Sequence, residues 1–167
     1  DVDIVPFLPL MGKDIQATGW VTGVVNITGE TKNPKVELSS AIESGSFNGV
    51  GIDEGFVLAT MQDQVIQIQR IQGAKSGYKL SVYGKIPLAA IFTSGYIPAN
   101  DSKSMDVTID FNEADMAVIP LLTTSVKEAT GPLKGTVHIT GTIDQPEAYG
   151  TVSVRNGTMK LASVENQ

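Results

Sequence analysis

The sequence predicts a mostly-β fold, in which a curled antiparallel sheet forms an elongated trough with an apolar interior and at most one or two short helices. Three observations lead to this prediction. Apolar and polar residues alternate in several segments, and the alternation is one-sided, which is typical of antiparallel strands with one buried face. Clusters of Gly, Pro, Asn and Asp separate these segments. No long helical periodicity runs between them.

The apolar positions of the alternating segments share one parity within each predicted strand, so they should line one face of the sheet. The segment QVIQIQRIQ starts in phase and then slips at Arg70 and Ile71, which indicates a β-bulge. The segment GVGIDEG is interpreted as a hairpin, with DEG at its turn. The residues predicted to line this face are Val21, Val25, Ile27, Val36, Leu38, Ile66, Ile68, Tyr78, Leu80, Val82, Ile86, Val107, Ile109, Phe111, Leu133, Val137 and Ile139.

A short apolar segment precedes the last alternating strand. Met116, Ile119, Leu122 and Val126 recur at near-helical spacing, but Pro120 lies inside the segment, so any helix should be short or kinked. We interpret the segment as a set of apolar side chains that packs on the sheet.

The sequence contains an internal repeat with an offset of 112 residues. GWVTGVVNITGETKNP (residues 19–34) aligns without a gap with GPLKGTVHITGTIDQP (residues 131–146). The alternative is a chance alignment of two Gly-rich β segments, but the phased glycines and proline argue against it. We therefore expect residues 1–167 to be a single fragment of a longer repeat protein, with a first unit at 1–112 and the start of a second at 113–167.

Glycines occupy the apolar face of the predicted strands rather than the polar face. Gly weakens a strand, so its repeated use there suggests a structural reason, such as sharp curvature or close approach of another backbone. A tightly curled sheet gains more from this than a flat sandwich does. The predicted curvature glycines are Gly23, Gly29, Gly84, Gly135 and Gly141.

Composition excludes several classes of function. The net charge of −6 and the 6% of aromatic residues argue against a nucleic-acid partner. The chain has no Cys, which excludes disulfides, thiol catalysis and Cys-ligated zinc. No apolar run approaches the length of a membrane span.

The residues give no catalytic constellation, so the chain is not expected to be an enzyme or to use a metal or cofactor. His138 is the single histidine, and its parity places it on the polar face as a solvated side chain. Residues 100–106 lack the ligand density of a calcium loop, and GSFNGVG does not join a strand to a helix as a phosphate loop would.

The order of these features resembles the repeat of the AsmA-like superfamily, and in particular the TamB C-terminal region. The motif is an acidic residue with a short apolar segment, then Gly131, Gly135, Val137, Ile139, Gly141, Thr142 and Pro146, followed by the NGT of residues 156–158. The first copy departs from this motif, with Glu30 at the position of Thr142 and Ser44 at that of Asn156.

The resemblance implies a β trough that is the periplasmic part of an inner-membrane-anchored protein of a diderm bacterium. It also implies an outer-membrane barrel partner of the Omp85 class, TamA-like or BamA-like. The expected function is an envelope-biogenesis module whose groove carries phospholipid acyl chains between the two membranes.

Two other functions stay open on the residues alone. The trough could be a scaffold or chaperone of a translocation and assembly module, which receives strands of unfolded outer-membrane barrel proteins or autotransporters at its edge. A passive solenoid or adhesin is the third alternative, but its usual repeat of about 20–30 residues is far shorter than the offset here.

Overall fold

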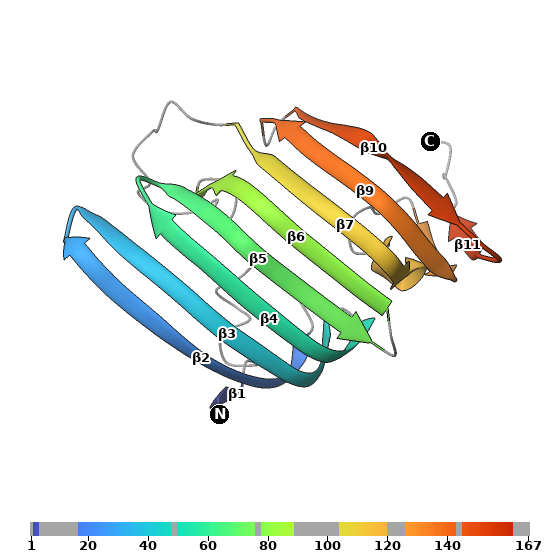
Figure 1. Ribbon diagram of the computed structural model, residues 1–167, viewed down its shortest axis with the longest axis horizontal. Coiled ribbons are helices and arrows are strands. Elements are labelled where there is room, and N and C mark those ends of the chain that lie inside the picture. The colour runs from blue at the N-terminus through green and yellow to red at the C-terminus, as the bar shows by residue number, and fades with distance from the viewer. Residues whose placement is uncertain are drawn as a thin grey trace, which may run out of the picture.

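The computed structural model describes residues 2–3, 17–47, 50–75, 78–88, 104–119, 126–142 and 145–161. Its main feature is one antiparallel sheet, in which neighbouring strands follow each other along the chain except at residues 126–130, which form a strand of a second sheet (Figure 1). In spatial order its strands are β1 (Val2–Asp3), β2 (Ala17–Glu30), β3 (Asn33–Phe47), β4 (Val50–Gln62), β5 (Val65–Lys75), β6 (Tyr78–Pro87), β7 (Asp106–Asp115), β9 (Pro132–Gly141) and β10 (Pro146–Val154).

A second, small sheet pairs β8 (Val126–Thr130) with β11 (Thr158–Leu161) beside the ends of β9 and β10 (Figure 1). The main sheet stays open, since no described strand joins β10 back to β1. Its strands are twisted, and β2 and β3 bend strongly near one end (Figure 1). The predicted class, a mostly-β curled antiparallel sheet, is therefore confirmed, and the sheet is not a closed barrel.

The hairpin turns form where the sequence places its turn residues. Thr31 and Lys32 join β2 to β3 within TKNP, and Asp63 and Gln64 join β4 to β5 within MQDQ. Both turn residues of the second hairpin have positive φ, 51° and 60°. This is the left-handed turn geometry that matches the twist of the flanking strands.

One predicted turn is wrong. Asp53–Gly55, the DEG of the expected hairpin, lies inside β4, which runs without interruption from Val50 to Gln62. Glu54 pairs with Glu43 on β3 and with Ala74 on β5. Pairing on both sides outweighs the low strand propensity of Asp, Glu and Gly.

The predicted bulge in β5 is confirmed. Ile68 pairs with Ala59, yet Arg70 already pairs with Leu58, so one extra residue is inserted here. The same shift separates Ile68 and Ile71 in their pairing with β6. The bulge returns Ile71 to the face that Ile68 occupies, because a single extra residue changes the parity.

Among the described residues of the short apolar segment after β7, Met116–Val118 form a 3-10 turn, η3. The carboxylate of Asp115 caps it by accepting a hydrogen bond from the backbone N–H of Ala117, at 3.0 Å. Pro120 lies outside the described residues. The described part of the chain contains no helix with the length and apolarity that a membrane span requires.

Equivalent residues of the two copies, 112 positions apart, make equivalent strand pairs. Val2 pairs with Val21, and Ala114 (2 + 112) pairs with Leu133 (21 + 112). The hydroxyls of Thr18 and Ser46 lie 2.9 Å apart, and those of Thr130 and Thr158, both shifted by 112, lie 2.6 Å apart.

The two copies differ in the continuity of their strands. β2 is one strand, whereas its counterpart is interrupted at Gly131 and continues as β8 and β9 in two sheets. The division into units at 1–112 and 113–167 stays a prediction.

Candidate functional site

One face of the main sheet is apolar across eight strands, β2 to β10. Residues paired across antiparallel strands share a face, so the pairing defines rows that cross the whole sheet. One such row consists of Val25, Leu38, Ala59, Ile68, Gly84, Val107, Ile139 and Ala148. We call this side of the sheet the apolar face.

The described lining residues predicted from the sequence all lie on the apolar face, but they differ in exposure. The β strand of Tyr78 is described, whereas its side chain lies outside the described residues. Ile68, Val107, Ile109, Phe111 and Leu133 are buried, and Val25 and Ile27 are exposed. The partly buried members are Val21, Val36, Leu38, Ile66, Leu80, Val82, Ile86, Val137 and Ile139.

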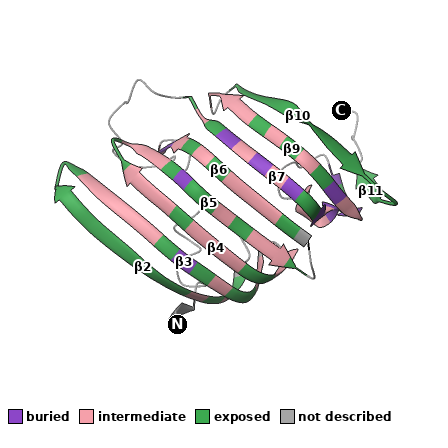
Figure 2. Ribbon diagram, in the orientation of Figure 1, coloured by how far each residue is buried: buried purple, intermediate pink, exposed green. Residues whose placement is uncertain are grey.

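The chain itself covers the apolar face around β7 and β9. The buried cluster there joins Met116 of η3 and Val126 and Ala129 of β8 to Phe111 and Leu133 of the sheet. Figure 2 shows that burial is concentrated on β7 and at one end of β9. Val107, Ile109, Phe111 and Leu133 therefore belong to the chain's own core and are not accessible to a ligand, whereas Ile68 on β5 is buried outside this cluster.

The apolar face is uncovered at the opposite end of the sheet. The exposed fraction is 56% for Val25 and 69% for Ile27. On β3, Val36 and Leu38 are half-buried beside them. Figure 2 shows β2 exposed along nearly its whole length. The accessible part of the candidate groove thus lies on β2 and β3 and extends toward β4.

Sequence reasoning missed several members of the apolar face. Val57, Ala59, Met61 and Ile71 complete its rows on β4 and β5. Phe56, Val57, Leu58 and Ala59 are all apolar, so alternation does not assign a face to this part of β4. Ile71 was missed because it lies beyond the bulge, and its parity with Ile68 is visible only once the inserted residue is known.

The predicted curvature glycines occupy two kinds of position. Gly23, Gly84 and Gly135 lie within rows of the apolar face. Gly29 and Gly141 pair with prolines at the ends of hairpins. A role in curvature stays a prediction for all five.

The structure also shows a local reason for glycine at positions 84 and 135. A Cβ at Gly84 would overlap the carbonyl oxygen of Asp106, and one at Gly135 would overlap that of Thr151. Both residues also have positive φ, 136° and 150°. These positions allow the neighbouring backbone to approach more closely than a side chain would permit.

The opposite face carries polar pairs on β7 and β9. His138 is exposed there, as predicted, and its Nε2 lies 2.7 Å from Oδ1 of Asp106. Thr136 donates a hydrogen bond to Asp110, at 2.7 Å. The His138–Asp106 pair has no local sequence signal, because the two residues lie 32 positions apart on different strands.

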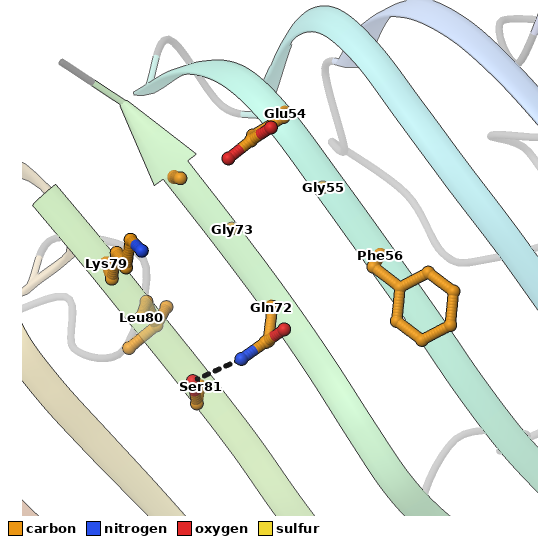
Figure 3. Close-up of a pocket in the computed structure, with 9 residues that line it drawn as sticks. Glu54, Gly55, Phe56, Gln72, Gly73, Lys79, Leu80 and Ser81 are labelled. Carbon is orange, nitrogen blue, oxygen red and sulfur yellow. Dashed lines mark hydrogen bonds between the residues drawn. The ribbon is translucent and has the colours of Figure 1, made fainter. Parts of the chain in front are cut away.

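A shallow pocket of about 260 Å³ opens between β4, β5 and β6. It lies where Gly55 pairs with Gly73 and neither residue supplies a side chain. Figure 3 shows Phe56 and Glu54 on one side of it, and the hydrogen bond from Gln72 to Ser81 on the other. Among its described lining residues, Ser81 accepts a hydrogen bond from the Gln72 amide, at 3.3 Å.

No group of three His, Cys, Asp or Glu side chains suited to a metal ion occurs among the described residues. The distinctive chemical feature of the structure is therefore the apolar face. No protein-family model, curated protein or solved structure matches this chain.

Proposed function

We propose that this chain is a non-enzymatic module of a hydrophobic groove that carries phospholipid between the inner and outer membranes of a diderm bacterium. The observation that supports this proposal is the apolar face, which crosses eight strands and is uncovered on β2 and β3. The resemblance to TamB-like repeats is a second, independent support. Within this proposal the module belongs to the periplasmic part of an inner-membrane-anchored protein with an Omp85-type barrel as partner.

The energetics of acyl chains require a long and continuous lining. Each methylene moved from water to an apolar surface gains about 0.8 kcal/mol, so two chains with roughly 30 methylenes cost about 25 kcal/mol to expose. A carrier must therefore shield nearly their whole length. The uncovered part of the apolar face, on β2 to β4, is roughly 10 Å wide at about 4.8 Å per strand, so this chain alone shields only part of an acyl chain. Strands added at either edge would extend it further.

The side chains of the face suit a ligand that is held by its apolar part. Val25, Ile27, Val36 and Leu38 provide aliphatic surface, and no charged residue lies in their rows on β2 and β3. Such a lining binds acyl chains without selecting a headgroup. Selectivity for one lipid class is therefore not expected of this region.

Site-specific photo-crosslinking tests the proposal. A photoreactive residue at Val25 or Leu38 is placed on the uncovered part of the apolar face, and one at Val24 or Ser39 is placed on the opposite face of the same strands. The protein is irradiated with phosphatidylethanolamine–phosphatidylglycerol vesicles, and lipid adducts are measured by mass spectrometry. We expect adducts at Val25 and Leu38 only. Equal capture at Val24 and Ser39, or no capture at all, would contradict the proposal.

A scaffold for barrel-protein assembly is the second candidate function. The observation that favours it is the exposed outer edge of β10, whose residues are exposed throughout. Such an edge can pair with a strand of an unfolded barrel protein. Disulfide trapping from a cysteine at Thr151 to single-cysteine variants of an unfolded outer-membrane barrel protein tests it, and a cysteine at Thr108 on the central strand β7 is the control.

A further inference from the structure

The β-bulge in β5 places two neighbouring side chains on the same side of the sheet. Ile68 and Ile71 both lie on the apolar face, so the two residues between them, Gln69 and Arg70, lie on the opposite side, which we call the polar face. Both side chains are exposed. Bulges occur often beside functional sites, where they redirect a side chain, so the surroundings of Gln69 and Arg70 are a candidate site.

Strand pairing extends this site into a row across the polar face. Arg70 pairs with Leu58 of β4, and Tyr83 of β6 lies opposite the bulge on the other side. Tyr83 pairs in turn with Thr108 of β7, and Thr108 pairs with His138 of β9. These five residues form a row at right angles to the strands, roughly 19 Å long for strands about 4.8 Å apart. Each strand of the row has a described neighbour on both sides, so the row does not depend on what lies beside the outer strands (Figure 1).

The row combines separate apolar surfaces with hydrogen-bonding groups. Leu58 is 38% exposed and Tyr83 is 44% exposed, so each offers apolar surface to a ligand. The amide of Gln69 donates a hydrogen bond to the hydroxyl of Thr60, at 2.8 Å, which fixes the position of the amide. A hollow of about 330 Å³ opens at this end of the row, and Leu58, Thr60 and Gln69 belong to its lining. Apolar and polar groups thus lie side by side, as they do in sites for small ligands.

The charge of the site is positive on β5 and β6. Arg70 and Lys85 are exposed, and neither forms an ion pair within the described part of the chain. Asp106 pairs with Lys85 in the sheet, but its carboxylate contacts His138 instead, at 2.7 Å. An exposed guanidinium without a carboxylate partner suits a carboxylate of a ligand, which it can bind through two parallel hydrogen bonds.

The position of the row determines the kind of ligand. A peptide that binds a sheet usually adds a strand at an edge, where the backbone groups are unpaired. The strands of the row are paired on both sides, so a ligand there meets side chains rather than free backbone groups. Sugar rings match these side chains. Their apolar faces can stack on Tyr83 and Leu58, while their hydroxyl and amide groups can hydrogen-bond to Gln69, Thr60 and Thr108.

We propose that this row of the polar face binds an extended glycan that carries carboxylate groups. The glycan lies across the strands, with one ring stacked on Tyr83, a carboxylate bound to Arg70, and one end in the hollow beside Gln69. Thr108 and His138 provide polar contacts toward the other end. The site is on the side of the sheet opposite to the candidate lipid groove, so the proposal stands whether or not that groove carries lipid.

Calorimetric titration with two matched oligosaccharides tests the proposal. One is a neutral oligomer of β-1,4-linked N-acetylglucosamine. The other is a peptide-free glycan strand of peptidoglycan, which has the same backbone with a lactyl carboxylate on alternate rings. The unaltered chain should bind both, and the carboxylated strand roughly tenfold more tightly. R70Q should abolish this preference. Y83A should weaken the binding of both by roughly tenfold, and Y83F should retain it, because the contact is made by the ring.

K79Q is the matched control for the loss of charge. Lys79 is exposed on the same strand and face as Tyr83, but it lies four residues away, or roughly 13 Å along the strand. K79Q should therefore leave both affinities unchanged. Binding of neither oligosaccharide, equal binding of both by the unaltered chain, equal effects of R70Q and K79Q, or unchanged affinity in Y83A would overturn the proposal. Binding to anionic phospholipid vesicles without binding to either oligosaccharide would also overturn it, and would assign the row to a membrane surface.

Discussion

Ser44 and Asn156 lie 112 residues apart and have the same left-handed backbone conformation, each with a φ of 48°. Each is followed by a glycine, Gly45 or Gly157, that lies against another glycine across the strand pair. Gly19 faces Gly45, and Gly131 faces Gly157, so closely that an added Cβ would approach the partner Cα to 2.8 Å and 2.7 Å. The same glycine–glycine contact thus occurs twice, once between β2 and β3 and once at Gly131 and Gly157, where the small sheet of β8 and β11 adjoins β9 and β10.

The first prediction concerns the cost of this conformation. A serine in the left-handed region is less favourable than glycine by about 1–2 kcal/mol, whereas Asn tolerates the region better. Replacing Ser44 with Gly should therefore raise the free energy of unfolding by about 0.5–1 kcal/mol, after the entropic cost of Gly is subtracted. Asn156→Gly should be nearly neutral. Urea denaturation of the two variants measures the difference.

Ser39→Gly is the matched control for that experiment. Ser39 is exposed on the same strand but has no positive φ. Its replacement should lower stability by about 0.5–1 kcal/mol, because Gly in an ordinary strand has only the entropic cost. Destabilisation by Ser44→Gly of the same size as by Ser39→Gly would show that the left-handed conformation at position 44 carries no strain.

The second prediction separates glycines that the fold requires from one that it does not. Gly135→Ala should lower the free energy of unfolding by about 2–4 kcal/mol, because the new Cβ would overlap the carbonyl of Thr151. Gly73 has open space around its Cβ position and no positive φ. Gly73→Ala should therefore stabilise the protein by about 0.4–1 kcal/mol through the unfolded chain. Equal effects of the two substitutions in thermal or urea unfolding would contradict this interpretation.

The strands with strict alternation could be predicted from the sequence, because side-chain parity is a local property. Leu80, Val82 and Ile86 needed only their own segment to be assigned to one face. β4 could not be predicted in this way. Its Asp53–Gly55 stretch has turn-like composition, and it is held in a strand by pairing with β3 and β5, which local sequence does not encode.

The sequence also did not indicate which part of the candidate groove is covered by the chain itself. Ile109 and Val25 both lie in segments where apolar and polar residues alternate, and both were predicted to line the groove. Yet Ile109 is 7% exposed and Val25 is 56% exposed. The difference arises because η3 and β8 fold back over β7 and β9. Alternation identifies the apolar face of a strand, but it does not show which segment packs on that face.

The third prediction uses this difference in burial. Leu133 is 2% exposed within the core cluster, so Leu133→Ala should lower the free energy of unfolding by about 2–5 kcal/mol. Ile27, a member of the same face at 69% exposure, should tolerate Ile27→Ala within about 0.5 kcal/mol. Chemical denaturation at a concentration where the protein is monomeric measures both. A large loss at Ile27 would indicate that the β2 end of the apolar face is covered in solution.

The last prediction concerns the pKa of Tyr149. Its hydroxyl donates a hydrogen bond to the carboxylate of Glu147 on the same strand. That bond, and then the negative charge of Glu147, raise the pKa of the Tyr149 phenol above its usual value of 10.0. Both interactions favour the protonated phenol, so Glu147→Gln should lower this pKa toward the usual value.

An ultraviolet titration of tyrosinate measures the effect, and Tyr149→Phe identifies the transition among the four tyrosines. Because the pKa is raised in the folded state, the associated stability is complete below the pKa of the unfolded chain. It is lost as the pH rises through the higher pKa of the folded chain. In Glu147→Gln this alkaline loss should shrink. An unchanged Tyr149 titration in that variant would show that Glu147 does not interact with the phenol in solution.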